Sequence, residues 1–317
     1  MIDKNKKLYI AGHQGMVGSA LMKKFVSEGF TNIVMRTFKE LDLRNQQSVD
    51  QFFKSEKPDY VIIAAAKVGG ILANNIYRAD FLYDNLMIEA NIINSSEANG
   101  VKKLIFLGSS CIYPKNCTQP IKEEYLLTSS LEETNEPYAI AKIVGLKLCQ
   151  SYYLQHNSNF YAIMPCNLYG HCDNFDLNSA HSLPALLRKV HEAKLKNNDN
   201  VLIWGSGKPY REFMFVEDIA DAIHFLMINI DAKDLYNQNI SCLNIGTGTD
   251  ITISDLALLI KKIIGFQGEL KYDPSKPDGT KRKLLDITRI TQLGWKYTTS
   301  LSEGLIKTYQ WFLENKT

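Results

Sequence analysis

The sequence predicts an α/β fold with a doubly wound parallel sheet and a smaller C-terminal α/β domain. Short apolar runs alternate with longer stretches of helical character in the first half of the 317-residue chain. This alternation is typical of βαβ units, in which a helix connects two parallel strands. A glycine-rich turn directly after the first apolar run supports the same prediction, because the first unit of such a sheet often carries one there.

The expected elements follow one another in a regular order. The expected strands are Leu8–Ala11, Asn32–Met35, Tyr60–Ala66, Lys103–Leu107 and Phe160–Met164, and the clearest helical stretches are Ser19–Glu28 and Asp84–Ala98. Polar, turn-rich segments become frequent after Gly170, at 171–178 and 196–200, and Pro and Gly punctuate 274–279. We therefore expect one domain over residues 1–170, joined by part of 212–245, and a second domain mainly over 171–317.

The composition argues against several classes of protein. Lys and Arg number 36 against 34 Asp and Glu, so a net charge of +2 gives no field that attracts nucleic acid or an anionic membrane. The apolar runs are far shorter than the roughly 18 residues of a membrane span. The charged start of the chain leads directly into a strand without a signal-peptide pattern, which predicts a cytoplasmic protein. Six cysteines without a CxxC pair or metal-type spacing predict reduced thiols and no metal site.

The glycine-rich turn reads Gly12-His-Gln-Gly15-Met16-Val17-Gly18 and precedes a helical stretch. Glycines in this setting let the backbone approach a pyrophosphate at a helix N-terminus. Three glycines alone could be plain turn chemistry, but their place at the end of the first strand favours a dinucleotide site. The sequence thus predicts a Rossmann-type sheet, with residues 1–170 as the dinucleotide-binding domain and 171–317 as the main substrate domain.

The second expected strand ends at Arg36-Thr37. An enzyme that selects NAD usually places Asp or Glu there, to bind the ribose 2′-hydroxyl. A cation suits a 2′-phosphate instead, so NADP(H) is the expected cofactor, and Asp42 and Leu43 are expected to border the adenine. The alternative for Arg36 is a solvated surface cation.

Tyr138-Ala-Ile-Ala-Lys142 places a phenol and an ammonium on one helix face, with Ser109-Ser-Cys111 upstream. The cation could stabilise the phenolate and bring the pKa of the phenol down from about 10. A phenol tuned in this way exchanges a proton with a carbonyl oxygen, which predicts hydride-transfer chemistry. A lone Tyr and Lys at this spacing would more often be ordinary helix-surface residues.

Several motifs in order give the chain its resemblance to a known family. These are Ala64-Ala-Ala-Lys67-Val-Gly-Gly70, Ser109-Ser-Cys-Ile-Tyr-Pro114, Asn135-Glu-Pro-Tyr-Ala-Ile-Ala-Lys142, Trp204-Gly-Ser-Gly207, Ser275-Lys-Pro-Asp-Gly-Thr280 and Arg282-Lys-Leu-Leu-Asp286. With them the chain resembles the GDP-L-fucose synthase family of extended short-chain dehydrogenases/reductases, from Ile10 nearly to Asn315. The resemblance implies an NADPH enzyme that epimerises GDP-4-keto-6-deoxy-D-mannose at C3 and C5 and then reduces C4 to give GDP-L-fucose.

The resemblance also implies roles for individual residues. Tyr138 protonates the C4 oxygen, Lys142 supports it and binds the nicotinamide ribose, and Ser109 hydrogen-bonds the same oxygen, as a developing alkoxide requires. Cys111 and His181 match the acid–base pair of the epimerisation. The implied cofactor contacts are Gly12, Gly15, Met16, Val17, Gly18, Arg36, Asp42, Leu43, Ala65, Lys142 and His181; the implied GDP-sugar contacts are Asn167, Lys189, Trp204, Arg211 and Lys283.

Other roles stay open for these residues and for the whole chain. A single Cys is most often an inert apolar side chain, and single His, Trp and Arg residues are often structural. Which of Cys111 and His181 is the base at each carbon is also open. The chain departs from the family at Gln14, Lys189, Cys166 and His171, where Arg, Arg, Thr and Pro are usual. The sugar could therefore be a GDP-4-keto-heptose of surface polysaccharide synthesis, reduced at C4 without epimerisation.

Three further alternatives rank lower. A 4,6-dehydratase would have an acidic pair where Ser110 and Cys111 stand. A 4-epimerase that retains NAD would not need the thiol. A redox-sensing NADP-binding regulator without turnover would not need Ser109, Tyr138 and Lys142 together. The resemblance also predicts a homodimer formed through two helices around residues 84–98 and 138–154.

Overall fold

The computed structural model describes residues 2–276 and 278–316 and contains a six-stranded parallel sheet. Pro277 of the segment 275–280 lies outside the described residues. The strands of this sheet are β1 (Leu8–Ala11), β2 (Ile33–Val34), β3 (Tyr60–Ile63), β4 (Lys103–Leu107), β5 (Phe160–Pro165) and β9 (Leu243–Ile245). Their order is β2-β1-β3-β4-β5-β9, so the chain reverses direction across the sheet between β1 and β3. In such sheets ligands bind outside the carboxyl ends of the strands at this reversal.

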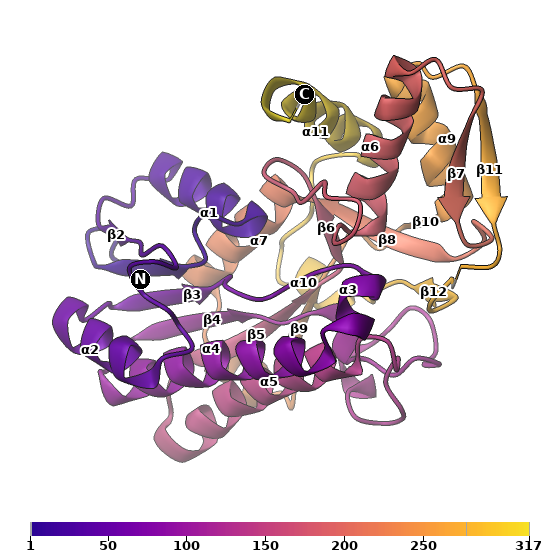
Figure 1. The fold of residues 1–317 in the computed structure, drawn as a ribbon. Helices are drawn as coiled ribbons and strands as arrows, with labels where there is room; N and C mark the ends of the chain where they lie inside the picture. The colour runs from indigo at the N-terminus through magenta and orange to yellow at the C-terminus, as the bar shows by residue number, and fades with distance from the viewer. Residues whose placement is uncertain (1, 277, 317) are drawn as a thin grey trace.

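Helices cover both faces of the main sheet (Figure 1). The helices α2 (Gln46–Glu56), α4 (Arg78–Ala98) and α5 (Glu136–His156) pack side by side on one face, and α1 (Met16–Ser27) packs against α7 (Val216–Asn229) on the other. The strands β1, β3, β4 and β5 are buried throughout, as expected for parallel strands that lie between two helical layers. The predicted doubly wound α/β fold is confirmed.

A second group of elements lies beyond the carboxyl end of the main sheet (Figure 1). Its strands are β6 (Asn167–Tyr169), β7 (Asn200–Trp204), β8 (Tyr210–Phe215), β10 (Asp250–Thr252), β11 (Glu269–Asp273) and β12 (Arg282–Lys283). β8 pairs with β6, β10 and β12, and β7 pairs with β11 in a separate two-stranded sheet. The helices α6 (Ser182–Leu195), α9 (Ile253–Ile264) and α11 (Leu301–Asn315) pack around these strands. The exact limits of the two domains stay a prediction.

Short helical segments complete the fold. They are α3 (Ile71–Ile76), α8 (Ala232–Tyr236), α10 (Thr288–Gln292), and the 3₁₀ turns η1 (Ser110–Ile112) and η2 (Glu123–Tyr125). Two apolar clusters form the core, one around the main sheet and one between α6, α9, α11 and the C-terminal strands. None of the helices in the described part of the chain is long and apolar enough to span a bilayer.

The expected element bounds agree with the structure at β1 and β4 and differ by one to three residues at β2, β5 and α1. Two further differences, at β3 and α4, lie nearer the functional residues. The third strand ends at Ile63 rather than Ala66, because the chain turns away there toward Gly69 and Gly70. The helix expected at Asp84 begins at Arg78, six residues earlier. Both differences lie at the carboxyl end of the sheet, where the functional residues gather.

Candidate active site

The glycine-rich turn connects β1 to α1 at the reversal of the sheet. Gly12 has φ +85°, and a Cβ there would lie 2.7 Å from the Cα and N of Ala65, so only glycine permits this approach. Gly15 is the N-cap of α1 and has no side chain to cap it. The N–H groups of Met16 and Val17, in the first helical turn, are therefore available for an anion. The turn and Ala65 form the cradle that a dinucleotide pyrophosphate requires.

Arg36 lies just after β2, beside this cradle. Its guanidinium pairs with Glu56 of α2, and its Cζ lies 5.4 Å from the centre of the Phe52 ring. Next to it, the N–H and hydroxyl of Thr37 both donate to Glu40 Oε2, at 2.7 and 2.8 Å. At the end of the second strand, the cation thus pairs with one carboxylate, Glu56, and the two Thr37 donors bind another, Glu40. This set of groups fits an anion such as a 2′-phosphate, although Glu56 already shares the charge of Arg36.

Asp42 and Leu43 follow in the same loop. Arg44 donates to both carboxylate oxygens of Asp42 and also pairs with Asp84 of α4, and the Leu43 carbonyl accepts from Asn91 at 3.0 Å. The hydrogen bonds from Arg44 hold the pKa of Asp42 below its ordinary value. These contacts hold in place the loop that the sequence analysis expects to border the adenine.

Tyr138 and Lys142 lie one turn apart near the start of α5. The Lys142 ammonium is 2% exposed, donates to the Leu107 carbonyl at 3.0 Å, and lies 5.8 Å from the centre of the Tyr138 ring. The same ammonium lies 2.8 Å from Glu89 Oε1 of α4. Glu89 is completely buried and was not among the predicted site residues.

Ser109 and Cys111 follow the carboxyl end of β4 and face the start of α5. Ser109 caps η1, where its hydroxyl accepts from the Cys111 N–H at 3.2 Å, and it also hydrogen-bonds Tyr138. The Cys111 thiol accepts from Asn135 Nδ2 at 3.3 Å and from Lys283 Nζ at 3.5 Å. The structure therefore brings the predicted hydroxyl, thiol and phenol together in one place.

The pKa of Tyr138 does not follow the sequence prediction. Burial of the phenol raises this pKa, and the proximity of Cys111 and Glu89 raises it further, while the hydrogen bond with Ser109 lowers it. The prediction that the pKa of Tyr138 lies below its ordinary value is wrong, because burial has the largest effect on the phenol. Tyr138 is consequently protonated at neutral pH, as a proton donor must be.

His181 is the N-cap of α6, in the C-terminal group of elements. Its side chain is exposed, yet protein groups surround it closely enough that desolvation, with a smaller effect from Lys283, lowers the pKa of the imidazole. The preceding loop contacts the segment between β3 and α3, because Gly70 N donates to Ser179 O at 2.9 Å and a Cβ on Gly70 would lie 2.5 Å from Ala180 O.

Arg211 and Lys283 are partners in the register of the parallel strands β8 and β12. The Arg211 guanidinium donates to the carbonyls of Tyr210 and Asp278, and burial lowers its pKa from the ordinary arginine value. Lys283 extends from this pair to the Cys111 thiol. Two cations therefore lie near the thiol, in a position suited to an anionic substrate.

Trp204 and Lys189 form a second binding surface in the C-terminal part. The Lys189 ammonium lies 4.7 Å from the centre of the half-exposed Trp204 ring, and Lys276 approaches the same ring at 5.6 Å. Burial lowers the pKa of Lys189. An aromatic face with two ammonium groups suits a stacked base that carries phosphates. Asn167 lies apart from this surface and donates to the Glu212 carbonyl at 2.8 Å.

Sequence reasoning missed three residues of this region: Glu89, Asn135 and Lys276. Asn135 stands three residues before Tyr138 in a motif that was recognised, so its place beside Cys111 could have been proposed. Glu89 is a single carboxylate in the apolar run Leu86-Met-Ile-Glu89-Ala90, a pattern that indicates burial. No sequence signal indicated that its partner would be Lys142.

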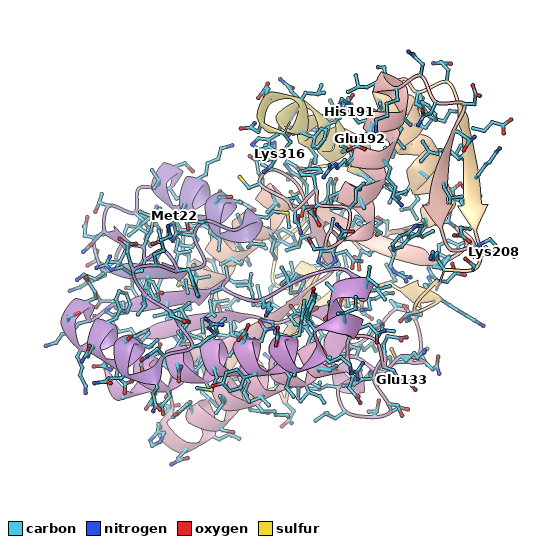
Figure 2. All side chains as sticks on the ribbon, viewed as in Figure 1. Met22, Glu133, His191, Glu192, Lys208 and Lys316 are labelled. Atoms are coloured by element: carbon cyan, nitrogen blue, oxygen red, sulfur yellow. The ribbon has the colours of Figure 1, made fainter. Side chains whose placement is uncertain are left out.

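Two hollows in the surface lie outside the catalytic residues. One, of about 640 Å³, is lined by Asn75, Arg78, Ser130, Leu131, Glu133, Thr134 and Glu136. Another, of about 350 Å³, is lined by Gly246, Ile287, Ile290, Thr291, Trp295, Lys296 and Tyr297. Glu133, on the wall of the first, is labelled in Figure 2. Neither is lined by Ser109, Cys111 or Tyr138, so convergent polar side chains identify the site better than the size of a hollow. Among the described residues, no cluster of three His, Cys, Asp or Glu side chains could hold a metal ion.

Residues 8–241 match the NAD dependent epimerase/dehydratase family. The chain belongs to this family. Among its members, it is 53% identical to GDP-L-fucose synthase 1 of Arabidopsis thaliana over 315 residues, which are 99% of this chain and 95% of the relative. It is 52% identical to the GDP-L-fucose synthase of Escherichia coli K12, with 98% of each chain covered. The resemblance that the motifs predicted is confirmed.

A solved structure can also be compared with this chain. The structure of MlghC, a GDP-mannoheptose C4 reductase from Campylobacter jejuni with NADP bound, matches this chain with a TM-score of 0.90. The two are 43% identical, and the match covers 99% of this chain and 100% of the other. Proteins similar to this chain thus include both GDP-L-fucose synthases and heptose reductases.

Proposed function

We propose that this enzyme converts a GDP-4-keto-6-deoxy-hexose into GDP-L-fucose, by epimerisation at C3 and C5 followed by NADPH-dependent reduction at C4. One observation carries the proposal. A protonated phenol, a hydroxyl and a thiol converge where β4 and α5 meet, in a chain that is 52% and 53% identical over nearly its whole length to two GDP-L-fucose synthases. The hydroxyl and phenol suit the reduction, and the thiol suits the epimerisation.

The cofactor would be held by the glycine-rich turn, Ala65 and Arg36, and its nicotinamide ribose by Lys142. NADPH supplies the hydride for C4 when it is bound. As the hydride reaches the carbon, the carbonyl oxygen gains negative charge and takes the proton of Tyr138. Ser109 donates a hydrogen bond to the same oxygen and so stabilises the charge where it develops.

Epimerisation uses the acidity that the C4 ketone gives to the protons on C3 and C5. One of Cys111 and His181 removes a proton from one face of the ring, and the other returns a proton to the opposite face. Ser109 stabilises the enolate oxygen between these two steps. No electron is gained or lost, so the cofactor is not consumed until C4 is reduced.

The C-terminal cleft would bind the GDP part of the substrate. Trp204 offers a flat face for the base, and Lys189 and Lys276 lie over that ring. Arg211 and Lys283 supply charge for the diphosphate. The side-chain Nδ2 of Asn167 donates to the Glu212 carbonyl, so its Oδ1 would be the atom that accepts from the substrate.

A GDP-4-keto-heptose is the second candidate substrate. The similarity to MlghC favours it, as do the departures at Lys189, Cys166 and His171 from the usual GDP-L-fucose synthase residues. On this alternative the enzyme would reduce C4 without inverting C3 or C5. We rank it second, because the identity to the two GDP-L-fucose synthases is about ten percentage points higher.

The test is an incubation with GDP-4-keto-6-deoxy-D-mannose and NADPH in deuterated water. We expect cofactor oxidation, with deuterium at both C3 and C5 of the product by mass spectrometry and NMR. Cys111→Ser is expected to lose inversion at both carbons by at least about 100-fold, because a hydroxyl is far less acidic than a thiol. If Cys111 is the base, exchange also stops; if it is the acid, exchange continues without inversion. His181→Ala should give the complementary result.

Other outcomes of the same incubation point to the alternatives. Oxidation of NADPH without deuterium in the product would mean that the enzyme only reduces C4. Absence of oxidation with this substrate, followed by oxidation with a GDP-4-keto-heptose, would identify the heptose as the substrate. Binding of NADPH without turnover of either sugar would support the regulator and contradict the proposed function.

Arg36 offers a test of the choice of NADPH. Arg36→Ala is expected to raise the Kd for NADPH about 10- to 100-fold, because a hydrogen bond to a charged group contributes about 1.5 to 3 kcal/mol. The Kd for NADH, which has no 2′-phosphate, should change little. Fluorescence titration measures both, and Lys54→Ala, which removes one exposed positive charge from neighbouring α2, is the control. Equal loss of affinity for the two cofactors would show that Arg36 does not contact the 2′-phosphate.

We also propose a homodimer that forms through α4 and α5. Their outward side chains include the exposed apolar residues Tyr83, Ile140 and Leu154. The two helices pack against one another over the sheet, so a second copy of the same pair would form a four-helix interface.

A further inference from the structure

Lys283 lies against the thiol of Cys111, the group that the proposed epimerisation uses. The Lys283 Nζ is 3.5 Å from the Cys111 Sγ, and Asn135 Nδ2 donates to the same sulfur at 3.3 Å. A lysine ammonium has three donors and no acceptor, so this contact uses a lone pair of the sulfur. A cation in such contact stabilises the thiolate, the form in which a cysteine can take up a proton.

The charge of Lys283 is not neutralised by an ion pair. The neighbouring Arg282 pairs with Asp250, but in the described part of the chain Lys283 pairs with no carboxylate and contacts the thiol instead. Its side chain is also partly buried, and water and salt screen a charge less there than at the open surface. The ammonium therefore acts on the sulfur without a paired anion to cancel its effect.

The backbone that carries Lys283 is held on both sides. The strand β12 pairs with the parallel strand β8. Directly after Lys283, the N–H of Leu284 donates to Gln119 Oε1 at 2.9 Å. The next N–H, of Leu285, donates to the buried Glu212 Oε2 at 2.9 Å. The position of the ammonium beside the thiol is therefore a consequence of the fold and not of a free loop.

Other titratable groups surround this lysine and thiol. They come from separate elements: Tyr138 of α5, Arg211 of β8, His181 at the start of α6, and Cys117 between η1 and η2. The Arg211 guanidinium donates to two backbone carbonyls. Among the described residues, Lys283 is the cation that contacts the sulfur directly. Its removal should therefore change the reactivity of the thiol most.

We propose that Lys283 is a further catalytic residue of the epimerisation, whose ammonium stabilises the Cys111 thiolate. If Cys111 is the base, its thiolate takes a ring proton: the C–H bond breaks, the S–H bond forms, and the C–H electron pair passes to the enolate. If Cys111 is the acid, the thiol protonates the enolate carbon and becomes the thiolate. Lys283 stays protonated in both cases, so the inference holds for either order. It rests on the proposed function, in which Cys111 exchanges a proton with the sugar.

The first experiment measures the alkylation of Cys111 by iodoacetamide, in protein without substrate or cofactor. Peptide mass spectrometry reads each cysteine separately, and the lysine does not attract this neutral reagent. We expect alkylation of Cys111 in Lys283→Met to be about tenfold slower at pH 7, because the thiolate is the reactive form. The difference should narrow as the pH approaches about 9, where the thiol of the variant ionises as well.

The same spectra contain internal controls. The exposed Cys172 should react equally in both proteins, and the buried cysteines should stay unmodified while the chain is folded. Lys281→Met removes an exposed charge two residues before Lys283 and is expected to leave the rate unchanged. If Lys283→Met does not fold, Lys283→Gln removes the same charge and retains a polar side chain. An unchanged rate at Cys111, or a loss of the same size at both pH values, would overturn the proposal.

The second experiment measures deuterium uptake at C3 and C5, with saturating GDP-4-keto-6-deoxy-D-mannose and with NADP⁺ in place of NADPH. We expect Lys283→Met to exchange at least about tenfold more slowly, and Lys283→Arg, which retains a charge, to exchange faster than Lys283→Met. A lysine that only binds the diphosphate would behave differently. Its loss would raise the Kd for GDP and leave alkylation and saturated exchange unchanged, and this result would overturn the proposal.

The two experiments separate this inference from the proposed function. Wild-type protein that takes up no deuterium at C3 or C5 would contradict the proposed function. Normal uptake by the wild type, with unchanged uptake by Lys283→Met, would contradict only the role of Lys283. Slower alkylation without slower uptake belongs to this second case, because the lysine would then affect the thiol without affecting the reaction.

Discussion

Replacement of Tyr138 by Phe is expected to lower the rate of C4 reduction by about 10² to 10⁴-fold and to leave deuterium exchange at C3 and C5 in place. The ring that packs against Phe81 is retained, so the fold should be unchanged. What is lost is the proton donor, and general acid catalysis contributes a factor of this size. Single-turnover oxidation of NADPH measures the reduction, and mass spectrometry in deuterated water measures the exchange.

Tyr152→Phe is the matched control for this prediction. It removes one hydroxyl from the same helix, where that hydroxyl donates to Asn94 at 2.8 Å near the surface. We expect both reactions to continue at the wild-type rate in this variant. If Tyr138→Phe lost exchange and reduction by the same factor, the phenol would be required for binding or for the enolate. The separation of the two reactions proposed above would then be wrong.

Local patterns predicted most of the main sheet, because β1, β3, β4 and β5 are buried apolar runs and helices connect the strands from β1 to β5. The β1 and β4 bounds agree with the prediction, and the six strands follow a parallel order. The pairing of β8 with strands from three distant parts of the chain could not be read from a periodic pattern. Those strands are short and partly exposed, and tertiary contacts rather than propensity define them.

The candidate site was predictable to the extent that its residues lie in contiguous motifs. The glycine-rich turn, Ser109 with Cys111, and Tyr138 with Lys142 each occupy a short segment whose spacing has a chemical reason. The contact between Lys283 and Cys111 joins residues 172 positions apart, and the contact between Glu89 and Lys142 joins two helices. Neither contact has a signature within a single segment.

The pKa of Tyr138 shows the limit of spacing as an argument. The i, i+4 relation with Lys142 correctly placed the two side chains on one helix face. It carried no information on burial, which has the largest effect on the pKa of the phenol, or on the anion that neutralises the lysine. Desolvation depends on everything that surrounds a group, so it becomes visible only when the fold is known.

Substitution of Gly18 by Ala is expected to abolish tight cofactor binding, with at least a 100-fold rise in the Kd for NADPH. Gly18 lies inside α1, where intrinsic propensity alone would make Ala about 1 kcal/mol more favourable. A Cβ there would lie 2.0 Å from the Gly12 carbonyl oxygen and 2.7 Å from the Cα of His13. These neighbours are backbone atoms and cannot rotate away, so the whole turn must move.

The steric cost of Gly18→Ala therefore outweighs the gain in helix propensity. Overpacking of a tight contact costs about 1 to 3 kcal/mol and sometimes more, and contact with backbone belongs at the upper end of that range. We expect a net loss of about 2 kcal/mol in the free energy of unfolding, measured by denaturant titration without cofactor. Gly15→Ala is the comparison, because its Cβ would meet only the Gly12 oxygen at 3.4 Å, an ordinary contact. If Gly18→Ala proved as stable as the wild type, the turn would adapt to a side chain at Gly18, and the contact between α1 and Gly12 would not define the cradle.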